Sequence, residues 1–216
     1  MSAYKFTRKR DIREPYKTIY IFTEGEKTEV NYFNSKKEEI SSDIRRKNIE
    51  IVVKGTGYNT KTIVDYAIDF VNSQRININP LESNDECWVV FDKDDFKEHF
   101  DNAIIRAMAN NLKVAYSNES FELWYLLHFS YFQSSVKRDI YVEKLTNLLR
   151  DLLKDKLVKY EKASQIMYEL VKNKEKDAIR NAKKLLLLHK NKGAYSKKDP
   201  STSVYLLVES LNKLKI

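Results

Sequence analysis

Acidic side chains follow three apolar, β-branched segments of the chain, at the points where strands would end. Glu24 comes directly after residues 18–23, Asp92 and Asp94 follow residues 87–91, and Glu122 lies shortly after residues 113–116. Side chains two positions apart in an extended segment point the same way, so Asp92 and Asp94 are expected to present both carboxylates to one side. Carboxylates gathered at one point repel each other unless a cation neutralises them. Oxygen donors suit Mg²⁺ or Mn²⁺, so the pattern predicts a site for one of these ions.

Each of these acids also has a simpler interpretation. The acids from Asp92 onward favour the start of a helix near Phe96, because negative charge stabilises a helix N-terminus. Glu122 is equally compatible with an exposed helix acid. What favours a shared site is Glu24, which lies at a different strand exit and is followed by Gly25, where the backbone can bend sharply.

Basic residues supply candidate contacts to a polyanion. The segment 137–198 holds 18 basic and 8 acidic residues, while the whole chain has a net charge of +8. This excess predicts contact with a nucleic-acid backbone, although solvated lysine-rich helices give the same composition. Lys27, three residues after Glu24, is a candidate phosphate contact or an ordinary turn lysine. The other candidates for backbone contacts are Lys190, Lys192, Lys197 and Lys198.

Other kinds of site are disfavoured by the sequence. Cys87 is the single cysteine, which excludes an intramolecular disulfide and a zinc site built on cysteines. The segment Gly55-Thr56-Gly57 lacks the lysine-serine ending of a phosphate-binding loop, so a plain turn is expected. His128 lies six residues after Glu122, about 240° around a helix, and a structural role is therefore expected for it.

The elements that must position the acids alternate between strand and helix. We expect strands at 18–23, 49–53, 87–91 and 113–116, with helices after residue 29, at 61–73, at 96–110 and from near residue 118. Such alternation predicts an α/β fold with a mostly parallel four-stranded sheet flanked by helices. Ligands of such sheets bind at the carboxyl ends of the strands, which is where the acids lie.

The carboxyl-terminal third of the sequence has a different pattern. Apolar residues at helical spacing predict helices at 140–153, 160–173, 177–189 and 203–214, with no strand among them. We therefore expect a basic arm at 1–17, an α/β domain at 18–136 and a helical extension at 137–216 that packs on it. Apolar residues make up 42% of the chain, in runs far too short for a membrane span. With no secretory signal and one cysteine, a cytoplasmic location is expected.

Four segments of the sequence carry a resemblance to a known family. They are TEGEKTEVNYF at 23–33, VVFDKDDF at 89–96, AYSNESFELWYLLHF at 115–129 and DPSTSVYLLVESL at 199–211. Together they resemble the RloB-like family, whose members have the Toprim fold of topoisomerases, primases and OLD-type nucleases. The resemblance implies a Toprim-like fold, with Glu24 in acid/base chemistry or metal binding and Asp92 and Asp94 as metal ligands. Primase-type members carry a third alternate acid where this chain has Phe96, so Glu122 is expected to complete the site.

The resemblance also implies an activity. The expected protein is an Mg²⁺- or Mn²⁺-dependent phosphodiesterase of the endonuclease type that cuts RNA or DNA in defence against phage. The family is found beside ATPases, and a separate ATPase partner is therefore expected to control it. The alternative is a catalytically silent Toprim-like module that binds nucleic acid or protein. The sequence leaves a homo-oligomer open and predicts no membrane contact.

Overall fold

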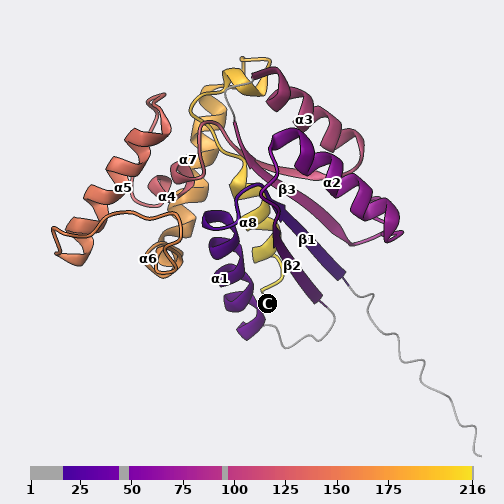
Figure 1. Ribbon diagram of the computed structural model, residues 1–216, viewed down its shortest axis with the longest axis horizontal. Coiled ribbons are helices and arrows are strands. Elements are labelled where there is room, and N and C mark those ends of the chain that lie inside the picture. Colours follow the sequence, from indigo (N-terminus) through magenta and orange to yellow (C-terminus); the bar gives the residue numbers. More distant parts are fainter. Residues whose placement is uncertain (1–16, 44–48, 94–96, 216) are drawn as a thin grey trace, which may run out of the picture.

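The central element of the protein is a four-stranded parallel sheet. The computed structural model describes residues 17–43, 49–93 and 97–215. Its strands are β1 (Lys17–Thr23), β2 (Ile49–Gly55), β3 (Glu86–Asp92) and β4 (Lys113–Ser117). They pair in the order β2-β1-β3-β4, and each pair is parallel. The predicted strands all form, and the carboxyl ends of β1 and β3 lie side by side (Figure 1).

Helices cover both faces of the sheet. The helices between and after the strands are α1 (Thr28–Asp43), α2 (Thr60–Ser73), α3 (Lys97–Ala109) and α4 (Glu122–Leu127). The helical part that follows comprises α5 (Arg138–Leu153), α6 (Met167–Val171), α7 (Glu175–Leu188) and α8 (Val204–Asn212), with 3₁₀ turns η1 (Lys172–Lys174) and η2 (Tyr195–Lys197). The fold is therefore the predicted α/β class with a helical carboxyl-terminal part (Figure 1).

Strand β3 shows how the sequence builds the two layers. Its side chains alternate, so Cys87, Val89 and Phe91 pack with α2 and α3, while Trp88 and Val90 pack in the core of the opposite face. All five are buried, which is the burial expected for a central strand of a parallel sheet. The core on the second face includes residues of α1, α4, α5, α7 and α8, so the helical part shares its core with the sheet.

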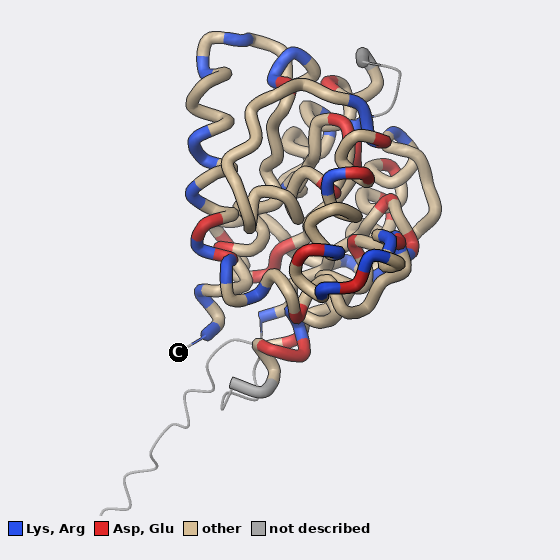
Figure 2. The backbone as a smooth tube through the Cα atoms, turned by 90° about the vertical axis from the view of Figure 1, so that its left-hand side faces the viewer, with Lys and Arg blue, Asp and Glu red and all other residues tan. Residues whose placement is uncertain are grey.

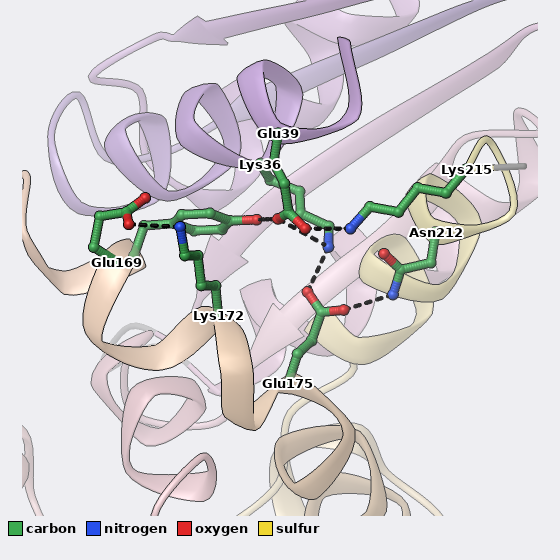
Figure 3. Close-up of polar contacts among 8 residues, drawn as sticks. Lys36, Glu39, Glu169, Lys172, Glu175, Asn212 and Lys215 are labelled. Atoms are coloured by element: carbon green, nitrogen blue, oxygen red, sulfur yellow. Dashed lines mark hydrogen bonds and ion pairs between the residues drawn. The ribbon is translucent and has the colours of Figure 1, made fainter. Parts of the chain in front are cut away.

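A buried lysine joins three of these helices. Lys36 of α1 is 1% exposed, and its Nζ lies 2.6 Å from Glu175 Oε2 at the start of α7 and 3.7 Å from Glu39 Oε2. Asn212, the last residue of α8, donates to Glu175 Oε1 at 2.6 Å, and Lys215 pairs with Glu39 (Figure 3). Burial lowers the pKa of Lys36, while the Glu175 carboxylate beside it acts in the opposite direction. The network therefore connects α1 with the start of α7, with the end of α8 and with Lys215.

The prediction of one helix is wrong for the first half of its range, residues 160–166. The sequence pattern predicts a helix at 160–173, but the structure has only α6 and the 3₁₀ turn η1 in that range. Tyr160 is 6% exposed, and its N–H donates to Thr146 Oγ1 at 3.1 Å. Lys162 O accepts the Thr28 hydroxyl at 3.1 Å, and Ala163 O accepts the Asn31 amide at 3.1 Å. These contacts use carbonyls that a helix would bond internally, so tertiary contacts replace the helix here.

The helices of the described chain are unsuited to a bilayer. Within residues 17–43, 49–93 and 97–215, no helix combines the length and the apolar character that spanning a membrane requires.

Candidate active site

A cavity of about 300 Å³ lies where β1 and β3 end. Five acidic residues line it, and they come from three separate parts of the sequence: Glu24, Glu26, Glu29, Asp92 and Glu122. The basic side chains along its wall are Lys27, Arg138 and Lys162. The structure thus brings three predicted acids, Glu24, Asp92 and Glu122, to one cavity at the carboxyl edge of the sheet.

Glu24 is held by the ends of two strands. Its N–H donates to Val90 O of β3 at 2.8 Å, and its Oε2 accepts the N–H of Asp92 at 3.0 Å. On the other side, Gly57 N–H donates to Glu24 O at 3.1 Å. The sequence predicts a plain turn at 55–57, whereas Gly55 ends β2 and residues 56–57 continue as an irregular segment beside Glu24. These contacts hold the Glu24 carboxylate beside the backbone N–H of Asp92.

Gly25 allows a close approach of the Glu29 side chain. A Cβ atom on this residue would lie 2.2 Å from Glu29 Oε2 and 2.9 Å from Glu29 Cδ. The absence of a side chain at 25 therefore lets Glu29, in the first turn of α1, turn its carboxylate back over the end of β1. Glu29 is 6% exposed.

Asp92, the last residue of β3, is bound on its side chain by two donors. Its Oδ2 accepts the Phe121 N–H at 3.1 Å and lies 3.2 Å from Nη2 of Arg138. The same guanidinium nitrogen also donates a hydrogen bond to Glu119 O at 3.2 Å. Arg138 is the first residue of α5, so the helical part of the chain contributes directly to the cavity.

Glu122 is the first residue of α4 and is 2% exposed. Its Oε1 accepts the hydroxyl of Tyr160 at 3.1 Å. It is therefore a buried acid of the cavity, and the interpretation as an exposed helix acid is excluded. Tyr160 lies in the segment that precedes α6, which gives this segment a second contact with the site.

Two of the buried carboxyl groups, Asp92 and Glu29, have a raised pKa. Burial raises the pKa of Asp92 well above its usual value, and the charges of Glu29, Glu122 and Glu24 add to this, whereas Arg138 opposes it. Burial also raises the pKa of Glu29, with Glu122 adding and Lys162 and Arg138 opposing. Negative charge is thus in excess inside the cavity, in spite of its basic wall.

The donor set suits a hard divalent cation. The acids of the cavity offer carboxylate oxygens, which Mg²⁺ and Mn²⁺ prefer, and a cation would relieve the repulsion that adds to burial in raising the pKa of Asp92. In the part of the chain that the structure describes, no three Asp, Glu, His or Cys side chains already form a group that could hold a metal ion. The remaining predicted ligand, Asp94, lies outside the described residues.

The predicted nucleic-acid contacts divide into two groups. Lys27 is exposed and lines the cavity. Lys190, Lys192, Lys197 and Lys198 lie after α7 and are not among the residues that line the cavity. Lys198 Nζ lies 4.5 Å from the centre of the Tyr195 ring. On the side of the molecule that carries α5 and α6, basic and acidic positions are interspersed along the chain (Figure 2).

The sequence interpretation missed Glu29, Arg138 and Lys162. Glu29 belongs to the same segment as Glu24 and stands in the first turn of a helix that starts at the sheet edge, so its position held a usable signal. Arg138 and Lys162 lie in the helical part, where only tertiary structure reveals that they approach the cavity. His128 is not part of the site: it is 1% exposed and its Nδ1 lies 2.9 Å from Trp124 O, as its predicted structural role requires.

The fold and the cavity define a parallel α/β protein with an acidic site at the carboxyl edge of its sheet. Comparison with protein families finds a match to the RloB-like protein family over residues 19–211, and the chain belongs to this family. No curated protein and no solved structure matches the chain.

Proposed function

We propose that this protein is an Mg²⁺- or Mn²⁺-dependent phosphodiesterase that hydrolyses RNA or DNA. One observation carries the proposal: Glu24, Glu29, Asp92 and Glu122 line one cavity, with Arg138 paired to Asp92. A cluster of carboxylates beside cationic side chains is an arrangement suited to holding a metal ion and a phosphate. Membership of the RloB-like family, and the Toprim-like pattern noted in its sequence, support the same reaction class.

The acids take separate roles in this proposal. Glu24, Asp92 and Glu122 hold the ion, together with Asp94, whose part rests on its spacing from Asp92 in the sequence. The bound ion supplies a Lewis acid for a phosphoryl oxygen and a more acidic water molecule. Glu29, whose pKa is raised by burial, is the acid that donates a proton to the oxygen that leaves.

The basic wall holds the substrate. Arg138 presents its guanidinium at the cavity from a fixed position, because Asp92 and the Glu119 carbonyl both accept from it. A guanidinium in this position binds a phosphate oxygen with charge-assisted hydrogen bonds. Lys27 and Lys162 line the same cavity and contact the phosphates on either side.

Cleavage assays test this function. Wild-type protein is incubated with single- and double-stranded RNA and DNA in Mg²⁺, in Mn²⁺ and in EDTA. We expect metal-dependent cleavage that falls by about 100-fold or more in Asp92→Asn, the size of one lost acid–base or ligand contribution. Asp69→Asn, an exposed acid of α2, is the matched control and should cleave like wild type. Equal cleavage by wild type and Asp92→Asn would refute the proposal.

The biological setting is part of the same proposal. The resemblance to RloB-like proteins supports a role in defence against phage, in the cytoplasm, with a separate ATPase that controls the nuclease. Co-expression with an ATPase encoded beside the gene tests this: the assay is repeated with and without the ATPase and ATP. A change in cleavage that is seen with the active ATPase but not with an ATPase whose active site is inactivated supports regulation by this partner.

A catalytically silent binding module is the second candidate. It is favoured by the ion pair between Arg138 and Asp92, which already neutralises part of the site, and by the lack of a ready-made ligand group among the residues described. Fluorescence anisotropy with labelled RNA and DNA separates the two. Binding that is independent of divalent ions and falls steeply with salt, without any cleavage, supports the module.

A further inference from the structure

An apolar groove lies along the outer edge of the sheet, away from the acidic cavity. Its volume is about 630 Å³, and α3, β4 and α8 contribute to its walls. The apolar side chains that line it include Ile104, Met108, Leu112, Leu186 and Leu206. Among the described residues, the groove and the acidic cavity have entirely separate linings.

The groove exposes apolar side chains to water, and a ligand that covered them would gain free energy from the burial of apolar surface. Met108 on α3 is 55% exposed and Leu206 on α8 is 43% exposed, and they line the same groove. Beside Met108, Ile105 is 59% exposed. Single exposed apolar residues are common, but two that line one apolar groove, Met108 and Leu206, indicate a candidate binding surface.

The groove is elongated. A second hollow, of about 380 Å³, shares five of its lining residues: Lys17, Glu86, Met108, Leu112 and Lys113. From there the hollow extends to Ile78 and Pro80, which precede β3. A ligand that fills both parts is therefore long rather than compact, as a peptide segment is.

The charges along the groove select an acidic ligand. Its charged lining residues are Lys17, Lys113, Lys198, Lys213 and Glu86. Glu86 Oε1 is shared by Lys17 at 2.9 Å and Lys113 at 3.1 Å, so one carboxylate serves two lysines. Positive charge is left in excess, and complementary charge steers association and selects partners.

The edge of β4 is closed to an added strand. Ser203 Oγ accepts the Tyr116 N–H at 2.8 Å and donates to Val114 O at 3.2 Å. The Ser203 N–H donates to Tyr116 O at 2.8 Å. The N–H and carbonyl of Tyr116 and the carbonyl of Val114, which an incoming strand would need, are therefore occupied. A peptide in this groove must bind through its side chains, as an amphipathic helix does when its apolar face enters a groove.

A second copy of this chain fits the groove poorly. In a two-fold symmetric dimer the same patch faces itself, so the lysines of both copies would be brought together. Like charges across an interface are unfavourable, which favours a partner of a different kind.

We propose that the groove between α3 and α8 binds an amphipathic helix of a partner protein, with apolar residues on one face and acidic residues along its borders. Met108 and Leu206 contact the apolar face, and Lys113 and Lys213 contact the acidic borders. This surface is independent of the acidic cavity, so it stands whether or not the proposed nuclease activity is found.

Model helices test the proposal on the full-length protein. Three labelled peptides share one composition of apolar residues: the first has glutamates on its polar face, the second has lysines there, and the third is the glutamate peptide in a scrambled, non-amphipathic order. Fluorescence anisotropy should show binding of the first peptide only, weakening as salt is raised. Leu206→Glu and Met108→Glu should each weaken it at least tenfold. Leu157→Glu, which changes an 88% exposed leucine outside the groove, should leave it unchanged.

Four outcomes would overturn the proposal. Equal binding of the lysine and glutamate peptides, or unchanged binding in Leu206→Glu at an unchanged melting temperature, would show that the groove is not the site. A dimer in sedimentation velocity that Leu206→Glu abolishes would assign the groove to a second copy. Binding to anionic phospholipid vesicles that the same substitution abolishes, without peptide binding, would assign it to a lipid surface.

Discussion

Asp92 is the residue whose charged form costs folding stability, although the proposed metal site needs that charge. Its side chain is 14% exposed, and its pKa is raised by burial and by the charges of three nearby acids, which Arg138 opposes without reversing the direction. A carboxyl whose pKa is higher in the folded than in the unfolded protein destabilises the fold at any pH where it is charged. The penalty disappears as the pH falls and the folded protein takes up the proton.

Asp92→Asn is therefore expected to stabilise the protein near neutral pH in EDTA. The gain should be about 1 kcal/mol, which corresponds to roughly 2–4 °C in melting temperature for a chain of this size. It should shrink as the pH is lowered, because wild-type Asp92 then becomes protonated. Thermal unfolding followed by circular dichroism at pH 5 and pH 8 measures it, with Asp69→Asn as control. A melting temperature that falls at both pH values would contradict the prediction.

His128 has the opposite effect on the pH dependence of stability. Its burial lowers its pKa to about 4, so the folded protein keeps the imidazole neutral while the unfolded chain takes up a proton near pH 6.5. The free energy of unfolding should therefore fall as the pH drops from about 6.5 to about 4, by at most ~1.4 kcal/mol per pH unit from this one proton.

The variant His128→Gln should remove this contribution and flatten the curve between those two pH values. Urea unfolding at several pH values measures it. His99→Gln changes an exposed histidine and should keep the wild-type slope. If both variants show the same pH dependence as wild type, His128 does not act as described.

At the scale of elements, the sequence predicts best those parts whose pattern is local. The strands and the acids at their ends follow from composition and from the parallel arrangement, which is why Glu24, Asp92 and Glu122 are found in one cavity. The segment before α6 is different, because Tyr160 and Lys162 make their contacts with α5, α4 and α1. Arg138 reaches Asp92 across 46 positions of sequence. A local sequence pattern cannot predict contacts between such distant residues, so the structure of the segment before α6 and the position of Arg138 could not be predicted from the sequence.

The contact between α1, α7 and α8 depends on a buried ion pair, which leads to a prediction for these elements. Glu175→Gln removes the carboxylate at 2.6 Å from the buried Lys36 ammonium and leaves it only the more distant Glu39, at 3.7 Å. Breaking a buried pair from one side costs about 3–5 kcal/mol, whereas replacing both partners by apolar groups costs far less. Glu175→Gln should therefore lower the melting temperature by about 6 °C or more.

The double variant Lys36→Met with Glu175→Leu should recover most of that loss. A double-mutant cycle in urea gives the coupling between the two residues. The exposed pair Arg180–Asp177 on α7 is the control, and its removal should change stability by less than about 1 kcal/mol. A double variant that is as unstable as the sum of its single changes would show that Lys36 and Glu175 act independently.

At the scale of the whole molecule, the helical part and the sheet form one structure. Ile21, Trp88 and Val90 of the sheet are buried in the same core as Leu185 of α7 and Leu207 of α8. Arg138 adds a polar contact between the two parts at the cavity. The residues 18–136, which the sequence suggests as an α/β domain, thus have one face of their sheet covered in part by their own α1 and α4 and in part by helices from beyond residue 136.

A chain that ends at Val136 should consequently fail to fold cooperatively. Without α5, α7 and α8, this face of the sheet keeps only α1 and α4 and is partly open to water, and the loss of this apolar burial exceeds the few kcal/mol by which a domain is usually stable. We expect binding of the dye ANS and no sharp thermal transition for this fragment, whereas the full chain should show one transition that is identical by tryptophan fluorescence and by circular dichroism. Co-expression of residues 137–216 as a separate chain should restore the transition, because it restores the covered face. A sharp transition of the fragment alone would show instead that the sheet and its first helices are a domain in their own right.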